Sequence, residues 1–252
     1  MTVKTFFIGL AASFALPWLV VVAVPYASMR NVEIPQFDEV DDGKTGYYAP
    51  VKAGRTQNGS EIYGAEGCAQ CHSQLSRPTY AGNDLGRPDL AGIQKDPNLG
   101  DTRRESNLWD YAGEEFAWIG ETRIGPDLGN YGRRIEIQAA EENAKIAAEL
   151  GVKVEELTVD QKFNKEKAVF AQLYNARLAK PNSVCPSNKH MFDEQPVFGQ
   201  GYENALEGPN GEQVVAKPKA LALTSYLLNM KRDSEVPYAM NHARSKKKAS
   251  AK

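Results

Sequence analysis

The chain is poor in the side chains that bind transition metals or form disulfides. Its 252 residues include only three cysteines and three histidines. Cys68 and Cys71 stand two residues apart with His72 directly after them, and no second Cys or His pair follows at short spacing to complete a four-ligand zinc site. The βαβ context that a thioredoxin-like cysteine pair needs is also absent. These absences exclude the usual zinc and dithiol functions and leave the Cys68–His72 segment to be explained.

An excess of positive charge is missing as well. The formal net charge is −2 and the isoelectric point is near 6.0, which predicts no nucleic-acid partner. Hydrophobic residues make up 42% of the chain, enough to build a core, so a disordered chain is excluded.

The Cys68–His72 segment has the C-x-x-C-H pattern through which haem c is attached. On one helical turn the two thiols lie close enough to react with both vinyl groups of one porphyrin, and the next residue directs its imidazole at the iron. A ligand one position away would miss the metal. The pattern therefore predicts one covalent haem c, with Cys68 and Cys71 as attachment points and His72 as an axial ligand.

A single long apolar run opens the chain. Thr5 to Tyr26 contains 22 residues without a charge, a length that spans about 33 Å as a helix, roughly the thickness of a bilayer core. We expect residues 1–28 to form a short cytoplasmic N-terminus and a transmembrane anchor, with Pro17 as a site of kinking. The alternative is a cleaved signal peptide with Lys4 as its positive region, although the run is longer than the usual apolar core of such peptides.

Charge then sets the expected orientation and the divisions of the chain. Lys4 precedes the apolar run and acidic residues follow it, so the positive-inside rule leaves the bulk of the chain outside the cytoplasm, where haem c is attached. Residues 29–55 are rich in Pro, Gly and acids and predict a periplasmic tether. Residues 56–240 are expected to form the haem domain, and residues 241–252 a basic, disordered tail.

Two helices are predicted to frame the haem domain. Ile62, Tyr63 and Cys68 fall on neighbouring turns of a short helix, with Ser60 as its N-cap and Gly64 and Gly67 open to a close neighbour. Near the other end, residues 217–232 place apolar side chains at helical spacing. A first helix carrying the haem motif and a last helix crossing it is typical of a small cytochrome c, so we predict a mainly α, class I-like cytochrome c domain.

The second axial ligand decides the function. The downstream candidates are His190, Met191, Met230, Met240 and His242. Met191 is favoured because it lies in a polar, proline-punctuated loop and because a neutral, soft thioether stabilises ferrous iron; His190 is the alternative. With both axial positions filled, the chain would carry electrons and would not be a catalyst by itself.

Several blocks of sequence resemble a known family. They are "GSEIYGAEGCAQCHSQLSRP", "YAGEEFAW", "TRIGPDLGNYGRR", "LYNARLAKPNSVCPSNKHMF" and "ALTSYLLNMKR". In this order, after an N-terminal anchor, they resemble subunit II of cbb3-type cytochrome c oxidases, the membrane-anchored mono-haem subunit. The resemblance implies a bacterial inner-membrane protein, with its haem domain in the periplasm. The implied partners are the catalytic haem–copper subunit and a di-haem cytochrome c subunit.

The resemblance also implies roles for individual residues. Cys68 and Cys71 match the thioether attachments, His72 the proximal ligand and Met191 the distal ligand. The surroundings of the haem are implied at four positions. Pro126 would accept the His72 Nδ1 proton, Leu128 would contact the haem, and positive charge near the propionates would come from Arg77 and Arg123.

Two segments depart from the family pattern. Residues 135–170 form a longer stretch than expected, predicted as one or two exposed helices broken near Gly151 and again at Leu157-Thr158; it is either a docking surface or a solvated insertion. Cys185 has no disulfide partner once Cys68 and Cys71 hold haem, and it is expected to be a free, buried thiol.

Three other functions stay open at this point. One is the mono-haem subunit of another respiratory complex, such as a nitric oxide reductase. Another is a membrane-tethered haem sensor with a displaceable ligand, and the third is a subunit that acts mainly in assembly.

Overall fold

The computed structural model describes residues 2–30, 53–93, 101–111, 114–208, 211–234 and 236. Most of the predicted tether (29–55), the whole of the predicted tail (241–252), and the candidate ligands Met240 and His242 lie outside the described residues. The chain divides into two compact units, Met1–Pro50 and Val51–Lys252.

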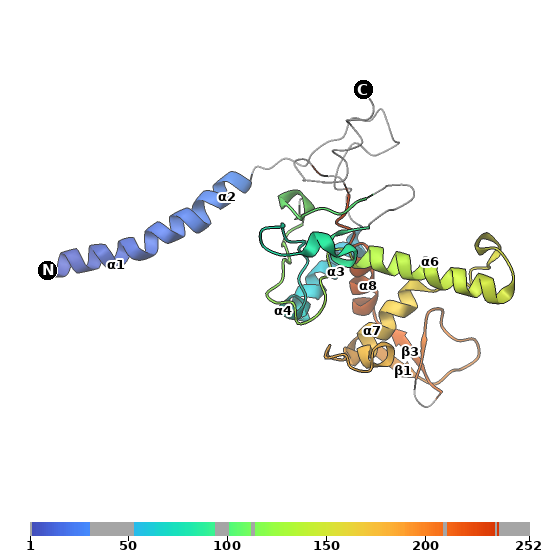
Figure 1. Cartoon of the computed structure of the whole chain (residues 1–252). Coiled ribbons are helices and arrows are strands. Elements are labelled where there is room, and N and C mark those ends of the chain that lie inside the picture. Colours follow the sequence, from blue (N-terminus) through green and yellow to red (C-terminus); the bar gives the residue numbers. More distant parts are fainter. Residues whose placement is uncertain are drawn as a thin grey trace, which may run out of the picture. The chain divides into compact units, whose positions relative to one another are not determined.

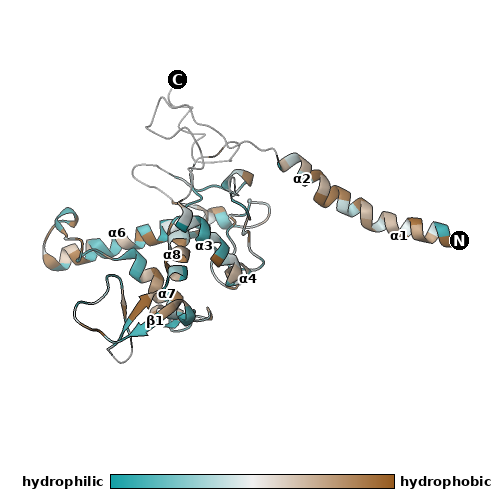
Figure 2. Cartoon of the chain, turned by 180° about the vertical axis from the view of Figure 1, so that it is seen from behind, coloured by the Kyte–Doolittle hydropathy of each residue, from teal (hydrophilic) through white to brown (hydrophobic). Residues whose placement is uncertain are grey.

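The described part of the first unit is one apolar helix. It consists of α1 (Val3–Trp18), a π-helical turn over Leu19–Ala23 and α2 (Val24–Met29). The turn follows Pro17, which lacks the N–H that an α-helix needs at this point. The most apolar 18-residue window of Val3–Met29 has a mean hydropathy of 2.3, and none of that window is buried. Figure 2 shows apolar colouring along most of this helix. The helix is therefore long and apolar enough to cross a membrane, although a signal sequence would meet the same criteria.

The second unit is mainly helical, as predicted. Its α-helices are α3 (Gly54–Ala65), α4 (Cys68–Cys71), α5 (Pro88–Ala91), α6 (Tyr131–Leu150), α7 (Lys165–Ala179) and α8 (Pro218–Leu228). Short 3-10 turns cover 84–86, 108–111, 154–156 and 189–191.

The first and last helices of this unit, α3 and α8, lie side by side (Figure 1). Their approach is closest at Gly59, where a Cβ atom would lie 2.1 Å from the carbonyl oxygen of Ala222. The pairing agrees with the predicted crossing of two terminal helices. The close neighbour expected at Gly64 is the indole of Trp118. The prediction of Ser60 as an N-cap is wrong, because Ser60 lies inside α3, where its hydroxyl accepts a hydrogen bond from Trp118 Nε1 (3.1 Å).

The segment predicted as an exposed insertion contributes to the core. The break near Gly151 is present, since this residue ends α6 in the left-handed conformation (φ 68°). However, α6 begins at Tyr131, and Ile135, Val169 and Phe170 are buried in the main hydrophobic cluster. The stretch 135–170 is therefore exposed only in part, because one face of each helix packs against the domain.

A small antiparallel sheet follows α7 and was not predicted. It contains β1 (Phe192–Gln195), β2 (Leu206–Glu207) and β3 (Gln213–Ala216) in the order β1-β3-β2. Phe192 pairs with Ala216, and its ring lies 6.1 Å from the ring of Phe170 and 5.6 Å from that of Tyr174. The sheet thus continues the hydrophobic cluster beyond α7.

Candidate cofactor site

The C-x-x-C-H segment forms a helical turn of its own. Gly67 interrupts the path of α3 in the left-handed conformation (φ 72°), which favours glycine, and α4 then covers only Cys68–Cys71. His72 follows in an extended conformation (φ −120°, ψ 128°). This local geometry directs Cys68, Cys71 and His72 into the same cavity.

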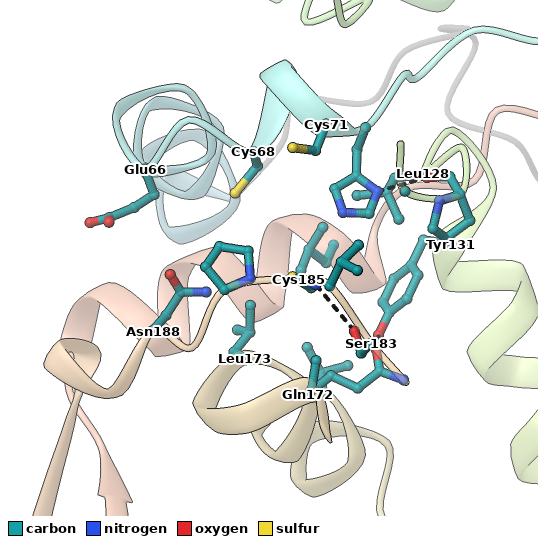
Figure 3. Close-up of a pocket in the computed structure, with 18 of the residues that line it drawn as sticks. Glu66, Cys68, Cys71, Leu128, Tyr131, Gln172, Leu173, Ser183, Cys185 and Asn188 are labelled. Carbon is teal, nitrogen blue, oxygen red and sulfur yellow. Dashed lines mark hydrogen bonds between the residues drawn. The ribbon is translucent and has the colours of Figure 1, made fainter. Parts of the chain in front are cut away.

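The cavity has a volume of about 400 Å³. Its apolar lining includes Leu128 from the segment before α6, Val169 and Leu173 of α7, and Leu223 and Leu227 of α8. Figure 3 shows the side chains of Cys68 and Cys71 on one side, with Leu173 and Cys185 across from them. A cavity of this size and lining is in the range of small-molecule and cofactor sites.

The imidazole of His72 is held by one hydrogen bond and one close contact. Its Nδ1 lies 2.7 Å from the carbonyl oxygen of Pro126, which can only accept, so Nδ1 carries a proton and Nε2 is the ring nitrogen left for another partner. A Cβ atom on Gly125 would lie 2.2 Å from His72 Cε1, so only glycine fits beside the ring. The arrangement orients the imidazole as metal-binding proteins do. It agrees with the predicted contact between Pro126 and His72.

A buried carboxylate supports this side of the cavity from behind. Asp127, which is 1% exposed, accepts hydrogen bonds from Ser73 Oγ (2.7 Å), Leu75 N (2.8 Å) and Gly129 N (2.8 Å). The backbone N–H groups of Gly125 and Leu128 donate to the carbonyls of Cys71 and Ser73, respectively (2.8 and 2.7 Å). Two segments about fifty residues apart are thereby joined, which fixes the position of His72.

Arg77 and Arg123 both bind the buried carboxylate of Asp84, and neither lines the cavity. Arg77 Nη2 lies 2.9 Å from Asp84 Oδ1, and Arg123 Nη1 lies 2.8 Å from Asp84 Oδ2. Burial by itself would raise the pKa of Asp84, but hydrogen bonds from the two arginines outweigh it and lower the pKa to about 2. Arg123 Nε also donates to Ser73 Oγ (2.7 Å). The arginines therefore brace the segment after His72. A different arginine, Arg134, lines the cavity, and its sequence context gave no signal for this role.

Leu128 lines the cavity as expected, but the two predicted distal ligands do not. Met191 is 1% exposed and packs in the hydrophobic cluster, with its backbone N–H bonded to the carbonyl of Asn188 (3.0 Å). The side chain of His190 is 56% exposed, and its Nε2 lies 2.9 Å from Glu66 Oε2. The structure therefore leaves both side chains outside the space that His72 faces.

Cys185 is a free thiol, as predicted, but its place at the cavity was not predicted. It is half-buried and lines the cavity from the loop that follows α7. Burial, followed by the nearby Cys185, raises the pKa of Cys68 to about 11. Burial likewise raises the pKa of Cys185. All three cysteines of the chain are free thiols in the structure. A lone cysteine in a polar loop carries no periodic or motif signal, so only the fold brings it to the cavity.

The three cysteines and His72 do not form a site for a bare metal ion. Among the residues that the structure describes, no group of three or more His, Cys, Asp or Glu side chains converges closely enough to hold one. The potential ligands instead line different sides of one apolar space. This spacing fits a large planar group better than a tetrahedral zinc ion, whose ligands must all lie about 2.0–2.3 Å from the metal.

No known family model matches the chain, and no curated protein matches its sequence.

Proposed function

We propose that the chain binds one haem c covalently in this cavity and transfers single electrons as the membrane-anchored cytochrome subunit of a cbb3-type terminal oxidase. The observation that carries the proposal is the position of Cys68, Cys71 and His72. All three line one cavity, and the Nδ1 atom of His72 is already occupied by Pro126. The free Nε2 atom is then the one available to iron.

The residues of the cavity suit the proposed cofactor. Aliphatic side chains provide an apolar lining for a macrocycle, and the two thiols project from one helical turn. Each thiol would add its S–H across one vinyl group, so that a C–S bond forms at one vinyl carbon and the proton goes to the other. No oxidant or further reactant is consumed. The attachment therefore needs only chemistry that Cys68 and Cys71 supply.

Iron in the bound cofactor would alternate between the ferric and ferrous states and so accept and donate one electron at a time. The protein would hold and insulate it. The Pro126 carbonyl keeps the imidazole of His72 in one orientation, and Leu223 and Leu227 of α8 exclude water from the interior.

The rim of the cavity offers an edge for electron exchange with partners. Ile124 and Val184 line the cavity and are 67% and 73% exposed. Exposed apolar side chains at the mouth of a cofactor site are suited to brief contact with another protein. We propose that a di-haem cytochrome c subunit or a soluble donor delivers electrons here, and that the haem–copper subunit receives them.

The proposed location follows from the N-terminal helix. A helix of 27 residues whose most apolar 18-residue window has a mean hydropathy of 2.3 would anchor the chain in the bacterial inner membrane and keep the haem domain in the periplasm, where haem c is attached.

The test uses the full chain purified in its native membrane complex. Intact-mass analysis should show the mass of one porphyrin added to the polypeptide, and the same complex should contain haem–copper and di-haem subunits. A chain without added porphyrin would overturn the proposal. Porphyrin on the chain in a complex without copper would instead favour the subunit of a nitric oxide reductase, and carbon monoxide binding to the reduced native protein would favour a haem sensor.

A further inference from the structure

We propose that the Sγ atom of Cys185 is the second axial ligand of the iron, so that the site has one imidazole and one cysteine sulfur ligand and no methionine. This inference rests on the proposed function, because it requires haem in the cavity. It assigns to Cys185 a role that the motif does not include. It also changes the expected electron-transfer properties of the site.

Few of the side chains that line the cavity can bind iron. Outside the Cys68–His72 segment, five lining residues carry an atom that can bind iron: Tyr63, Glu66, Tyr131, Lys180 and Cys185. Three of them are engaged elsewhere. Tyr63 is fully buried with its hydroxyl directed at the His72 carbonyl (3.4 Å), on the side of the cavity that His72 already occupies. Tyr131 donates to Gln172 Oε1 (2.6 Å), and Glu66 binds His190.

The remaining choice is between Lys180 and Cys185. Lys180 is exposed, so its ammonium group is solvated and would have to lose its proton and its hydration before it could bind a metal. Cys185 is half-buried and faces Cys68 and Cys71 across the cavity (Figure 3). Sulfur is also the softer ligand, which suits iron in an apolar site.

The methionines of the described residues lie away from the cavity. Met29, Met191 and Met230 are the methionines in the described part of the chain, and none of them lines the cavity. The segment of Met191 is fixed on both sides, because its N–H donates to Asn188 and its carbonyl accepts from Lys217 N (3.0 Å each). The carbonyl of Met230 accepts from Gly132 N (3.0 Å), and its side chain is 3% exposed. Both side chains are buried in the hydrophobic cluster, and neither lines the cavity.

Cys185 lies in the loop of residues 180–188, which we call the 180–188 loop. The C-terminal end of this loop is fixed to α7, since Ser187 Oγ donates to the Tyr174 carbonyl (2.6 Å) and Asn188 N donates to the Leu173 carbonyl (3.0 Å). Cys185 N donates to Ser183 Oγ (3.3 Å), which turns the loop over the cavity. The loop therefore holds the thiol on the side opposite α4.

The chemistry of such a ligand differs from that of methionine. As the Fe–S bond forms, the thiol of Cys185 gives its proton to solvent and binds as a thiolate, with no change in the oxidation state of sulfur. Its negative charge stabilises ferric over ferrous iron, whereas a methionine ligand raises the reduction potential. We therefore expect a lower potential than a histidine–methionine site would have.

The experiment compares three variants of the full chain, each purified in its native complex: Cys185→Ser, Cys185→Met and Met191→Leu. Optical and electron paramagnetic resonance spectra of the ferric protein identify the axial ligands, and a redox titration gives the midpoint potential. Cys185→Ser should lose the low-spin thiolate spectrum and admit carbon monoxide to the reduced protein. Cys185→Met should stay low-spin with a positive shift in the potential. Met191→Leu should keep the wild-type spectrum.

The outcomes separate the inference from the proposed function. Wild-type-like spectra in both Cys185 variants, or a ligand change in Met191→Leu, would overturn the inference while leaving haem on the chain. A wild-type chain without porphyrin would overturn the proposed function itself. If Cys185→Ser does not fold, the decision passes to Cys185→Met, which keeps sulfur and apolar volume at the position.

Discussion

The two sides of the cavity are held in different ways. On the side of α4, backbone and side-chain hydrogen bonds join the Cys68–Ser73 segment to Gly125, Leu128 and Asp127, which lie about fifty residues further along the chain. On the other side, the 180–188 loop is bonded to α7 just before it, through Tyr174 and Leu173. The α4 side is therefore fixed by contacts distant in sequence, and the loop side by local ones.

This difference suits the two sides of the cavity to different roles. A rigid α4 side suits permanent attachment, because covalent chemistry and a fixed imidazole need one geometry. A locally held loop opens at lower free energy than the core does, so a ligand carried on it can be altered with less damage to the fold.

The largest expected effect is the loss of covalent haem. Replacing both cysteines of α4, Cys68→Ala with Cys71→Ala, should abolish the porphyrin mass on the polypeptide because no thiol remains to add to the vinyl groups. The matched control is Cys185→Ala on the loop side, which should keep the full porphyrin mass. Denaturing mass spectrometry measures both. Porphyrin retained on the double variant, or lost from the Cys185→Ala control, would contradict covalent attachment on the α4 side alone.

The next effect concerns the fit around His72. Gly125→Ala places a methyl group where a Cβ would lie 2.2 Å from the imidazole, so we expect a loss of about 3 kcal/mol in the free energy of unfolding, the upper range for overpacking. Chemical denaturation measures it. Gly54→Ala is the control, because a Cβ at that position would have no atom within 4 Å and the cost should stay within about 0.5 kcal/mol. An equal loss of unfolding free energy in Gly125→Ala and Gly54→Ala would contradict tight packing around His72 on the α4 side.

The ion pairs of Asp84 with Arg77 and Arg123 should contribute somewhat less to the free energy of unfolding. Asp84→Asn removes the charge that Arg77 and Arg123 share, which should cost about 2 kcal/mol at neutral pH. Because the pKa of Asp84 is lowered to about 2 in the folded protein, its contribution is full above the usual carboxyl pKa near 4, declines below it and is lost near pH 2.

Denaturation of wild type and Asp84→Asn at a series of pH values tests this dependence. The difference in unfolding free energy should be constant from neutral pH to about pH 4 and should narrow as the pH approaches 2. A difference that grew as the pH fell would have the wrong sign and would contradict the assignment of an ionised Asp84.

The smallest change in stability is expected at His190, which follows the 180–188 loop. His190→Ala breaks the exposed contact with Glu66 and should cost no more than about 1 kcal/mol, with unchanged ferric spectra. A spectral change would mean that His190 reaches the iron in the loaded protein.

The parts predicted well from sequence are those that depend on neighbouring residues. Cys68, Cys71 and His72 meet because they share one helical turn, and the break at Gly151 follows from a single backbone conformation. The contact between Pro126 and His72 is confirmed, but its prediction came from the family resemblance and not from spacing.

Most of the features that could not be predicted depend on contacts between residues far apart in the sequence. Asp84 binds both arginines because the fold buries its carboxylate between them, and no pattern near Arg77 or Arg123 signals this. The strands of the sheet are two to four residues long, too short for an alternating pattern to be recognised. Cys185 reaches the cavity only because α7 and its loop return to α4.

The position of α8 also bears on biosynthesis. Leu223 and Leu227 close the cavity, yet they follow Cys71 by about 150 residues. At ribosomal rates of about 5–20 residues per second, the thiols emerge on the order of 10 seconds before the helix that will cover them exists. Under the proposed function, haem would therefore be attached to an open, unfinished chain, and docking of the last helix would close the cavity over it.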